Sequence, residues 1–171
     1  MNHDAELRPA SDLAELRRAY SCFPSGVVAV CRQSGGGPLG MSASSFTTVS
    51  LEPPLVSVCV RQESGTWRTL REQTRLGVSV FAADQGELCR QLAGPSPGRF
   101  NGVQPIPGDD GELFIPGATA HLAVEIAGEV PAGDHLVVLL RVHALRSDHE
   151  AAPLVFHGSS FHALSPHASQ R

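Results

Sequence analysis

The sequence predicts a mainly β protein, an antiparallel barrel with peripheral helices, and three observations lead to this fold class. Short valine-rich runs are separated by connections rich in Gly, Pro and Ser. Several runs alternate valine with small residues, as in Val56–Val60, which suits a tightly curved sheet. The long alternating runs Ala120–Val130 and His135–Leu145 are joined by Pro-Ala-Gly-Asp and predict a hairpin. The predicted strands are Val27–Cys31, Leu39–Met41, Leu55–Val60, Leu76–Phe81, Leu122–Val130, Leu136–Leu145 and Leu154–His157.

Three helices are expected beside these strands. In the first, Ser11–Cys22, apolar residues recur at helical spacing, and Ser11 or Asp12 is placed to cap its start. The other two are Gly65–Gln73 and Asp84–Leu92, the latter with Asp84 as its N-cap.

A chain of 171 residues fits one domain, which we expect over residues 11–164. The ends, residues 1–10 and 165–171, are polar or charged and are expected to be flexible. The connection Gly94–Gly117 is long and rich in Gly and Pro, and long loops of this kind often cover functional sites.

Composition excludes several classes of partner. The net charge is −4 and the arginines are scattered, so no basic stripe predicts a nucleic-acid interface. All 13 basic residues are arginine, which rules out a P-loop lysine. No apolar run is long enough to cross a membrane and the first residues are charged, so we expect a cytoplasmic protein with no membrane partner. The four cysteines form no C-x-x-C pair and are interpreted as buried free thiols.

Two motifs receive a structural interpretation. Gly35–Gly40 matches the dinucleotide pattern G-x-G-x-x-G, but Pro38 interrupts it and the residues that follow read as a strand, so we expect a hairpin turn. His157 and His162 are five residues apart, which fits neither helical nor strand spacing for zinc ligands, and no metal is expected.

The segment Gly40–Ser50 consists largely of small and hydroxyl-bearing residues and leads into a Pro-Pro strand entry. Such a segment lets the backbone approach a flat polar ring or a phosphate closely. A Ser/Thr-rich loop that bonds its own backbone would have the same composition, and spacing alone does not decide between the two.

A set of short segments occurs in one order along residues 19–164: Phe23–Val27, Gly40–Val56, Ser64–Trp67, Val78–Gln85, Arg99–Phe100, Gly133–His135 and Pro153–Phe161. In this order they resemble the flavin reductase-like family of FMN-binding split barrels, the small reductase components of two-component flavin-dependent monooxygenases. The resemblance implies an antiparallel split barrel of Greek-key type.

The resemblance also implies roles for individual residues. The flavin ring and ribityl chain would lie against one continuous segment, Ser42, Ala43, Ser44, Ser45, Phe46 and Thr47. Around them, Ser64 and Thr66 would hold the phosphate, Ala82 and Gln85 would close another side, Phe100 and Phe161 would pack near the rings, and His135 would receive the nicotinamide. Ser42 and Ser44 stand where family members often carry Thr and Asn, so weak flavin retention is expected.

The implied function is that of an NAD(P)H:flavin oxidoreductase, in which NADH or NADPH reduces FAD or FMN. Reduced flavin would then diffuse to a separate monooxygenase, and the enzyme would be a homodimer. Hydride transfer requires the two rings to stack at roughly 3 to 3.5 Å but no acid–base residue, so His135 is assigned an orienting role. The alternative is a non-catalytic flavin-binding split-barrel module. A pyridoxamine-phosphate-oxidase-like enzyme is disfavoured because no basic cluster for a second phosphate is visible.

Overall fold

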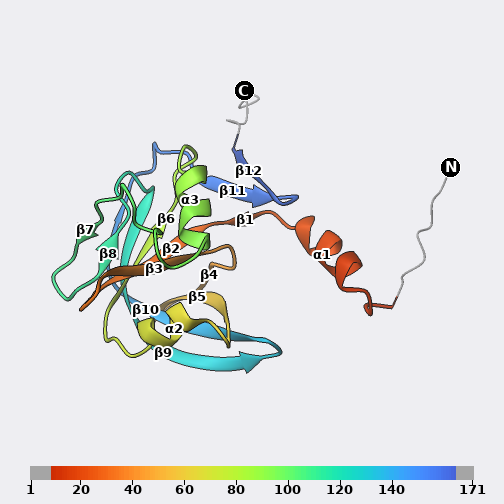
Figure 1. The fold of residues 1–171 in the computed structure, drawn as a ribbon, viewed down its shortest axis with the longest axis horizontal. Helices are drawn as coiled ribbons and strands as arrows, with labels where there is room; N and C mark the ends of the chain where they lie inside the picture. Colours follow the sequence, from red (N-terminus) through yellow and green to blue (C-terminus); the bar gives the residue numbers. More distant parts are fainter. Residues whose placement is uncertain (1–8, 165–171) are drawn as a thin grey trace.

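The computed structural model describes residues 9–164 and confirms a mainly β, antiparallel protein (Figure 1). The helices are α1 (Leu13–Ser21), α2 (Gly65–Leu70) and α3 (Gly86–Ala93). The strands are β1 (Ser25–Gly26), β2 (Val28–Ser34), β3 (Gly37–Ala43), β4 (Thr47–Leu51), β5 (Pro54–Arg61), β6 (Leu76–Val80), β7 (Ile106–Pro107), β8 (Leu113–Phe114), β9 (Ala120–Ala132), β10 (His135–Ser147), β11 (Leu154–His157) and β12 (Ser160–Ala163).

The main sheet has seven strands in the order β3-β2-β6-β9-β10-β5-β4. Its two edge strands, β3 and β4, follow one another in the chain and are separated only by Ser44–Phe46, yet they do not pair with each other. The sheet therefore curls toward closure without becoming the closed barrel that we expected. The three linking residues leave an opening between the edges, and this opening positions the candidate site.

Two hydrophobic cores lie on opposite faces of β2. Val28 and Val30 face the core inside the curled sheet, which α2 completes with Trp67 and Leu70. On the other face, Ala29 and its neighbours pack with α3, β8 and β11. Because β2 is covered on both sides, it reads as a continuous apolar run rather than an alternating one. Removing the Trp67 side chain would cost about 3 to 5 kcal/mol of stability.

The predicted long hairpin is confirmed: β9 and β10 pair along their length and turn at Gly133-Asp134. Gly35–Gly40 is also a hairpin, with β2 and β3 joined at Gly35-Gly36. Strands β1, β4, β7, β8 and β12 were not predicted. All but β4 contain four residues or fewer, too few for a sequence period to show.

The three helices form where the sequence predicts them, but their first and last residues differ from the predicted ones. Asp12 caps α1 by accepting the N–H groups of Ala14 and Glu15. The predicted cap of α3 was wrong: Gln85 occupies the N-cap position, and its side chain bonds Ala82 and Pro116 instead of the first turn of the helix. Helix α2 ends at Leu70, three residues before the predicted end.

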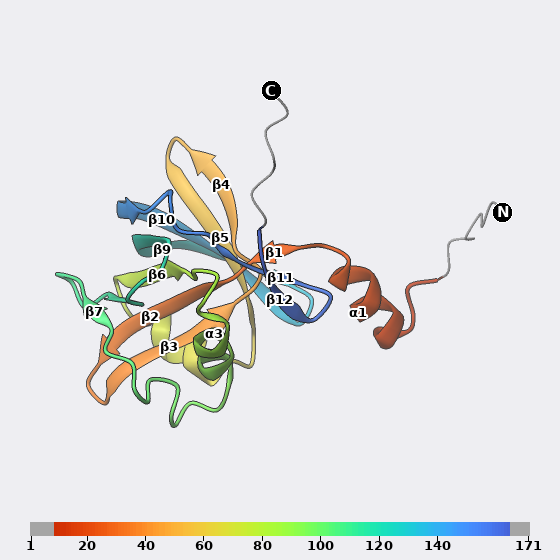
Figure 2. The same cartoon turned by 90° about the horizontal axis from the view of Figure 1, so that it is seen from above.

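Helix α1 stands apart from the β body in both views (Figures 1 and 2). It buries none of its residues, and Leu13, Tyr20 and Phe23 around it are 68%, 71% and 76% exposed. Of the ends predicted to be flexible, residues 1–8 and 165–171 lie outside the described residues. No helix within residues 9–164 is long and apolar enough to cross a membrane.

Candidate active site at the opening between the sheet edges

The predicted polar segment Ser42–Thr47 lies at the opening between the two sheet edges. Three hollows with volumes of about 860, 310 and 400 Å³ adjoin it, and all three include Ser44 in their walls. We call this continuous region the edge cleft. Its central wall is built from Ser and Ala side chains, so a flat ligand can approach the backbone closely.

Ser45 fixes the shape of this wall. Its hydroxyl accepts the Cys59 N–H at 2.8 Å and donates to the Cys59 carbonyl at 3.0 Å. Cys59 belongs to β5, so the side chain of Ser45 replaces the missing backbone pairing where the chain leaves β3. The polar segment is therefore held by one of its own hydroxyls, and Ser42 and Ser44 remain beside the hollows.

A cationic corner closes one end of the edge cleft. Arg99 Nη1 donates to the Gly40 carbonyl at 2.8 Å and to the Thr66 hydroxyl at 2.9 Å, while its Nε donates to the Gly94 carbonyl. Partial burial lowers the pKa of the Arg99 guanidinium below its ordinary value. The Ser64 hydroxyl, in the same hollow, accepts the Trp67 N–H at 3.1 Å and donates to the Met41 sulfur at 4.0 Å, a weak acceptor that a phosphate oxygen would replace. These donors suit a phosphate.

His135 lies across the same hollow, at the tip of the long hairpin. Its Nδ1 is 2.8 Å from Asp134 Oδ1, and this hydrogen bond holds the pKa of Asp134 below its usual value. The turn is anchored by Gln62, whose side-chain amide donates to the carbonyls of Gly133 and His135. Asp134 therefore orients the imidazole, while Gln62 holds the backbone of the turn that carries it.

Aromatic and cationic side chains line the far part of the edge cleft. Arg90 of α3 lies 4.8 Å from the ring centroid of Phe161, which tilts against Phe156 at 5.4 Å. All three line the 310 Å³ hollow together with Cys89, whose thiol pKa is raised by burial. Phe46 and Thr47 line the largest hollow instead.

Three of the predicted binding residues lie outside the edge cleft. Gln85 bonds the Ala82 N–H and the Pro116 carbonyl, and Ala82 is buried beside it. Phe100 packs on the second hydrophobic core, where its ring approaches Gly40. The structure brings the other predicted residues to the cleft or, for Thr66, into contact with Arg99. The role of each toward a ligand stays a prediction.

Arg99 is the main residue of the edge cleft to which the sequence assigned no role, although Arg99–Phe100 was one of the segments that carried the resemblance. It comes from the long Gly94–Gly117 connection and meets Thr66, 33 positions earlier in the chain. No spacing pattern joins these two residues. The Gly- and Pro-rich composition of the connection was the available signal, and part of this connection does reach the edge cleft.

The fold and the cleft together define a split-barrel protein whose site fits a flat, phosphate-bearing ligand such as a flavin: small residues form the cradle, and neutral and cationic donors stand at one end. The chain belongs to the flavin reductase family, because the family model described as "Flavin reductase like domain" matches residues 20–165. This confirms the resemblance seen in the sequence.

Three known proteins are similar over nearly their whole length. An NADH:FMN oxidoreductase of Rhodococcus qingshengii is 32% identical, over 94% of this chain and 86% of the relative. The NADH:FAD oxidoreductase of Streptomyces globisporus C-1027, solved with NAD and FAD fragments, is 35% identical with a TM-score of 0.89, over 96% of this chain and 99% of that one. BorF, the flavin reductase component of a bacterial two-component tryptophan halogenase, is 34% identical with a TM-score of 0.81, over 90% and 98%.

Proposed function

We propose that this chain is a flavin reductase that transfers hydride from NADH or NADPH to FAD or FMN. The observation that carries the proposal is the edge cleft itself. A wall of small residues faces an oriented imidazole and ends at Arg99, Ser64 and Thr66. The names of the relatives support NADH as donor and both flavins as acceptors.

Each part of the edge cleft has a separate task in this proposal. A bound flavin supplies the ring that accepts the hydride. Ser42–Thr47 hold one face of the ring through close backbone contact, and Ser45 keeps that backbone in place. Arg99, with Ser64 and Thr66, binds the phosphate. His135 orients the nicotinamide against the ring without transferring a proton.

We also propose that the reduced flavin leaves for a separate oxygenase. Two cationic side chains, Arg61 and Arg99, line the hollow that holds the phosphate corner. Arg99 is already bonded to two backbone carbonyls and to Thr66, which favours release of the flavin over permanent retention. BorF, as the reductase component of a two-component halogenase, supports a separate partner enzyme. The free state of all four cysteines supports the reducing environment of the cytoplasm as the location.

A homodimer is the last part of the proposal. The exposed apolar side chains around α1 need a partner surface, and a second copy of the chain is the simplest partner for a symmetric enzyme. The largest hollow lies between the end of α1 and Ser44–Thr47, so a partner packed there would also close the edge cleft.

The test is consumption of NADH by the purified protein with FAD, with FMN and without flavin, repeated with NADPH. We expect NADH oxidation that depends on added flavin. Flavin binding without NADH consumption would support the non-catalytic module instead. The absence of both binding and turnover would reject the flavin site altogether.

A further inference from the structure

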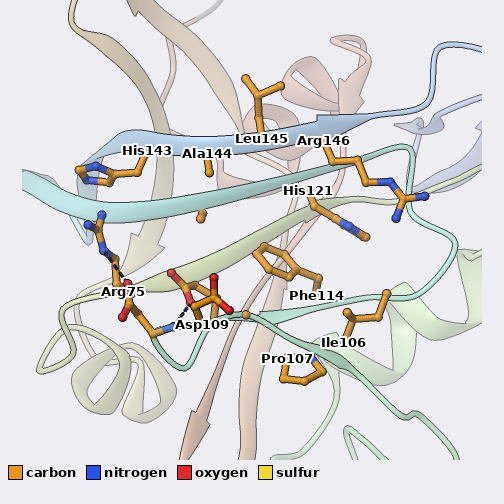
Figure 3. A pocket seen from close by; sticks show the side chains of 14 residues that line it. Arg75, Ile106, Pro107, Asp109, Phe114, His121, His143, Ala144, Leu145 and Arg146 are labelled. Atoms are coloured by element: carbon orange, nitrogen blue, oxygen red, sulfur yellow. Dashed lines mark hydrogen bonds and ion pairs between the residues drawn. The ribbon is translucent and has the colours of Figure 1, made fainter.

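A second cavity of about 400 Å³, seen from close by in Figure 3, lies beside β7 and β8, which Figure 1 places at the end of the molecule away from α1. It shares no lining residue with the edge cleft. The turn between β7 and β8 roofs it, and β9 and β10 form its floor. Its volume lies within the range of small-molecule sites, roughly 300 to 1,000 Å³.

The cavity exists because a row of small residues crosses three neighbouring strands. Gly77, Ala123 and Ala144 lie opposite one another on β6, β9 and β10. A side chain at Gly77 would collide with the Leu113 carbonyl, so the glycine lets β8 rest directly on the sheet. Strand β8 does not extend over Ala123 and Ala144, and the space left above these two small side chains is the cavity.

The roof of the cavity is held by buried polar contacts. Glu112 is 4% exposed; its side chain accepts the Asp110 N–H at 2.9 Å and its carbonyl accepts the Gly108 N–H at 2.8 Å. Arg32 donates to the Asp110 carbonyl at 3.1 Å and fastens the turn to β2. A roof fixed in this way keeps the cavity open without a ligand, which lowers the cost of binding.

One wall is a rigid aromatic surface. The rings of Phe114 and His121 stack with centroids 5.1 Å apart and an interplanar angle of 29°. His121 Nε2 donates to the Ile115 carbonyl at 2.8 Å, which fixes both the tautomer and the orientation of the ring. Such a wall favours a planar aromatic ligand.

Charge is divided between the two ends of the cavity. At one end the acidic side chains Asp109, Asp110 and Glu112 gather with Arg75, which lies 3.8 Å from Asp110 and 3.7 Å from Glu125, so a ligand carboxylate is disfavoured at this end. At the other end Arg146 stands beside His121 (Figure 3) and takes part in none of the ion pairs found within residues 9–164. Arg146 is therefore the cation left for a ligand.

We propose that this cavity is a second small-molecule site that binds a planar aromatic carboxylate. The ring of the ligand lies over Ala123 and Ala144 against the Phe114–His121 wall, and its carboxylate pairs with Arg146. A guanidinium matches a carboxylate by two parallel hydrogen bonds, so the acid binds better than a neutral analogue. The site is independent of flavin.

The test is calorimetric titration of the full chain with 2-naphthoate and with its uncharged amide. Naphthoate should bind with a dissociation constant below about 1 mM and the amide about tenfold more weakly. Arg146→Gln should remove this difference, while Arg18→Gln on the remote helix α1 serves as the matched control. Ala144→Leu, which fills the floor, should abolish binding of both ligands.

Saturating FMN should leave the naphthoate titration unchanged. Displacement by FMN, equal affinity for acid and amide, or undiminished naphthoate affinity in Arg146→Gln would each overturn the proposal, as would absence of binding at millimolar naphthoate. Arg146 is exposed near the end of β10, so its substitution leaves folding intact and the test stands even if Ala144→Leu fails to fold. The titration requires no flavin turnover, so its result is separate from that of the reductase assay.

Discussion

The Ser45 hydroxyl bonds both backbone polar groups of Cys59, at 2.8 Å to its N–H and 3.0 Å to its carbonyl. A serine side chain thus supplies the contacts that a neighbouring strand would make to β5. Because a side chain takes the place of a backbone strand here, the sheet stays open between β3 and β4. An enzyme that must admit two flat cofactors needs such an opening, and Ser45 stabilises it without closing it.

Removing the Ser45 hydroxyl should loosen the edge cleft. Ser45→Ala loses both bonds to Cys59, and we expect about 1 to 2 kcal/mol less stability in urea unfolding. The KM for flavin should rise several-fold while kcat changes little, because the ring wall loses its fixed shape. Ser34→Ala is the matched control, since Ser34 bonds the Gly37 carbonyl at the remote β2–β3 turn. A flavin KM equal to that of the control would contradict the role of Ser45.

Arg99 should control flavin affinity through the phosphate. Arg99→Gln removes the cation and its bond to Thr66, so we expect FMN to bind about ten- to a hundredfold more weakly. Riboflavin, which has no phosphate, should bind both proteins alike. Fluorescence titration of each flavin measures the difference, with the exposed Arg68→Gln as control. An equal loss for riboflavin would show that Arg99 supports the fold rather than the phosphate.

His135 should act on the nicotinamide and leave the flavin alone. His135→Ala is expected to raise the KM for NADH several-fold with an unchanged dissociation constant for FMN, because the imidazole faces the edge cleft from the hairpin tip. Asp134→Asn should show a smaller effect of the same kind, since Asp134 only orients the ring. Steady-state kinetics at saturating flavin provide the test. An unchanged KM for NADH in His135→Ala would remove the residue from the site.

The sequence predicted what depends on local patterns. The long hairpin at β9 and β10 follows from two alternating runs and a turn, and the helix at α1 follows from its spacing and its cap. Strand β4 was missed because Thr47–Leu51 does not alternate clearly between apolar and polar residues, and because polar residues also stand beside it in the sequence. The opening between β3 and β4 could not be predicted, because it depends on how the whole sheet curls.

The residues of the candidate site also divide into those that a local pattern revealed and those that only the complete fold brings together. Ser42–Thr47 are contiguous, so one segment of sequence revealed them together. Arg99 and Thr66 meet only after α2 and the Gly94–Gly117 connection have packed, and no periodicity encodes that contact. Gln85 and Phe100 were expected at the ligand from resemblance, but their side chains serve the Pro116 turn and the second core.

The buried thiol of Cys31 should make stability fall at alkaline pH. Burial raises the pKa of Cys31 to about 12, from an ordinary value of 9.0. Between these pH values the unfolded chain loses the thiol proton and the folded chain keeps it, so stability decreases as pH rises, by about 1.4 kcal/mol per pH unit at most. The chain has no lysine to titrate in this range. Urea unfolding of Cys31→Ala from pH 9 upward should show a flatter profile, and an identical slope in both proteins would contradict the assignment.

The exposed apolar surface of α1 should be covered by a second copy of the chain. Leu13 and Tyr20 are 68% and 71% exposed, and replacing both with serine removes apolar area without touching the β body. We expect light scattering during gel filtration to give a dimer for the wild type and a monomer for Leu13→Ser/Tyr20→Ser. Arg18→Gln on the same helix, at a residue outside the largest hollow, should stay dimeric. Because the largest hollow adjoins the end of α1, the monomer should also bind FMN more weakly. A wild-type monomer at high concentration would contradict the homodimer, and full FMN affinity in the monomeric variant would show that each edge cleft is complete within one chain.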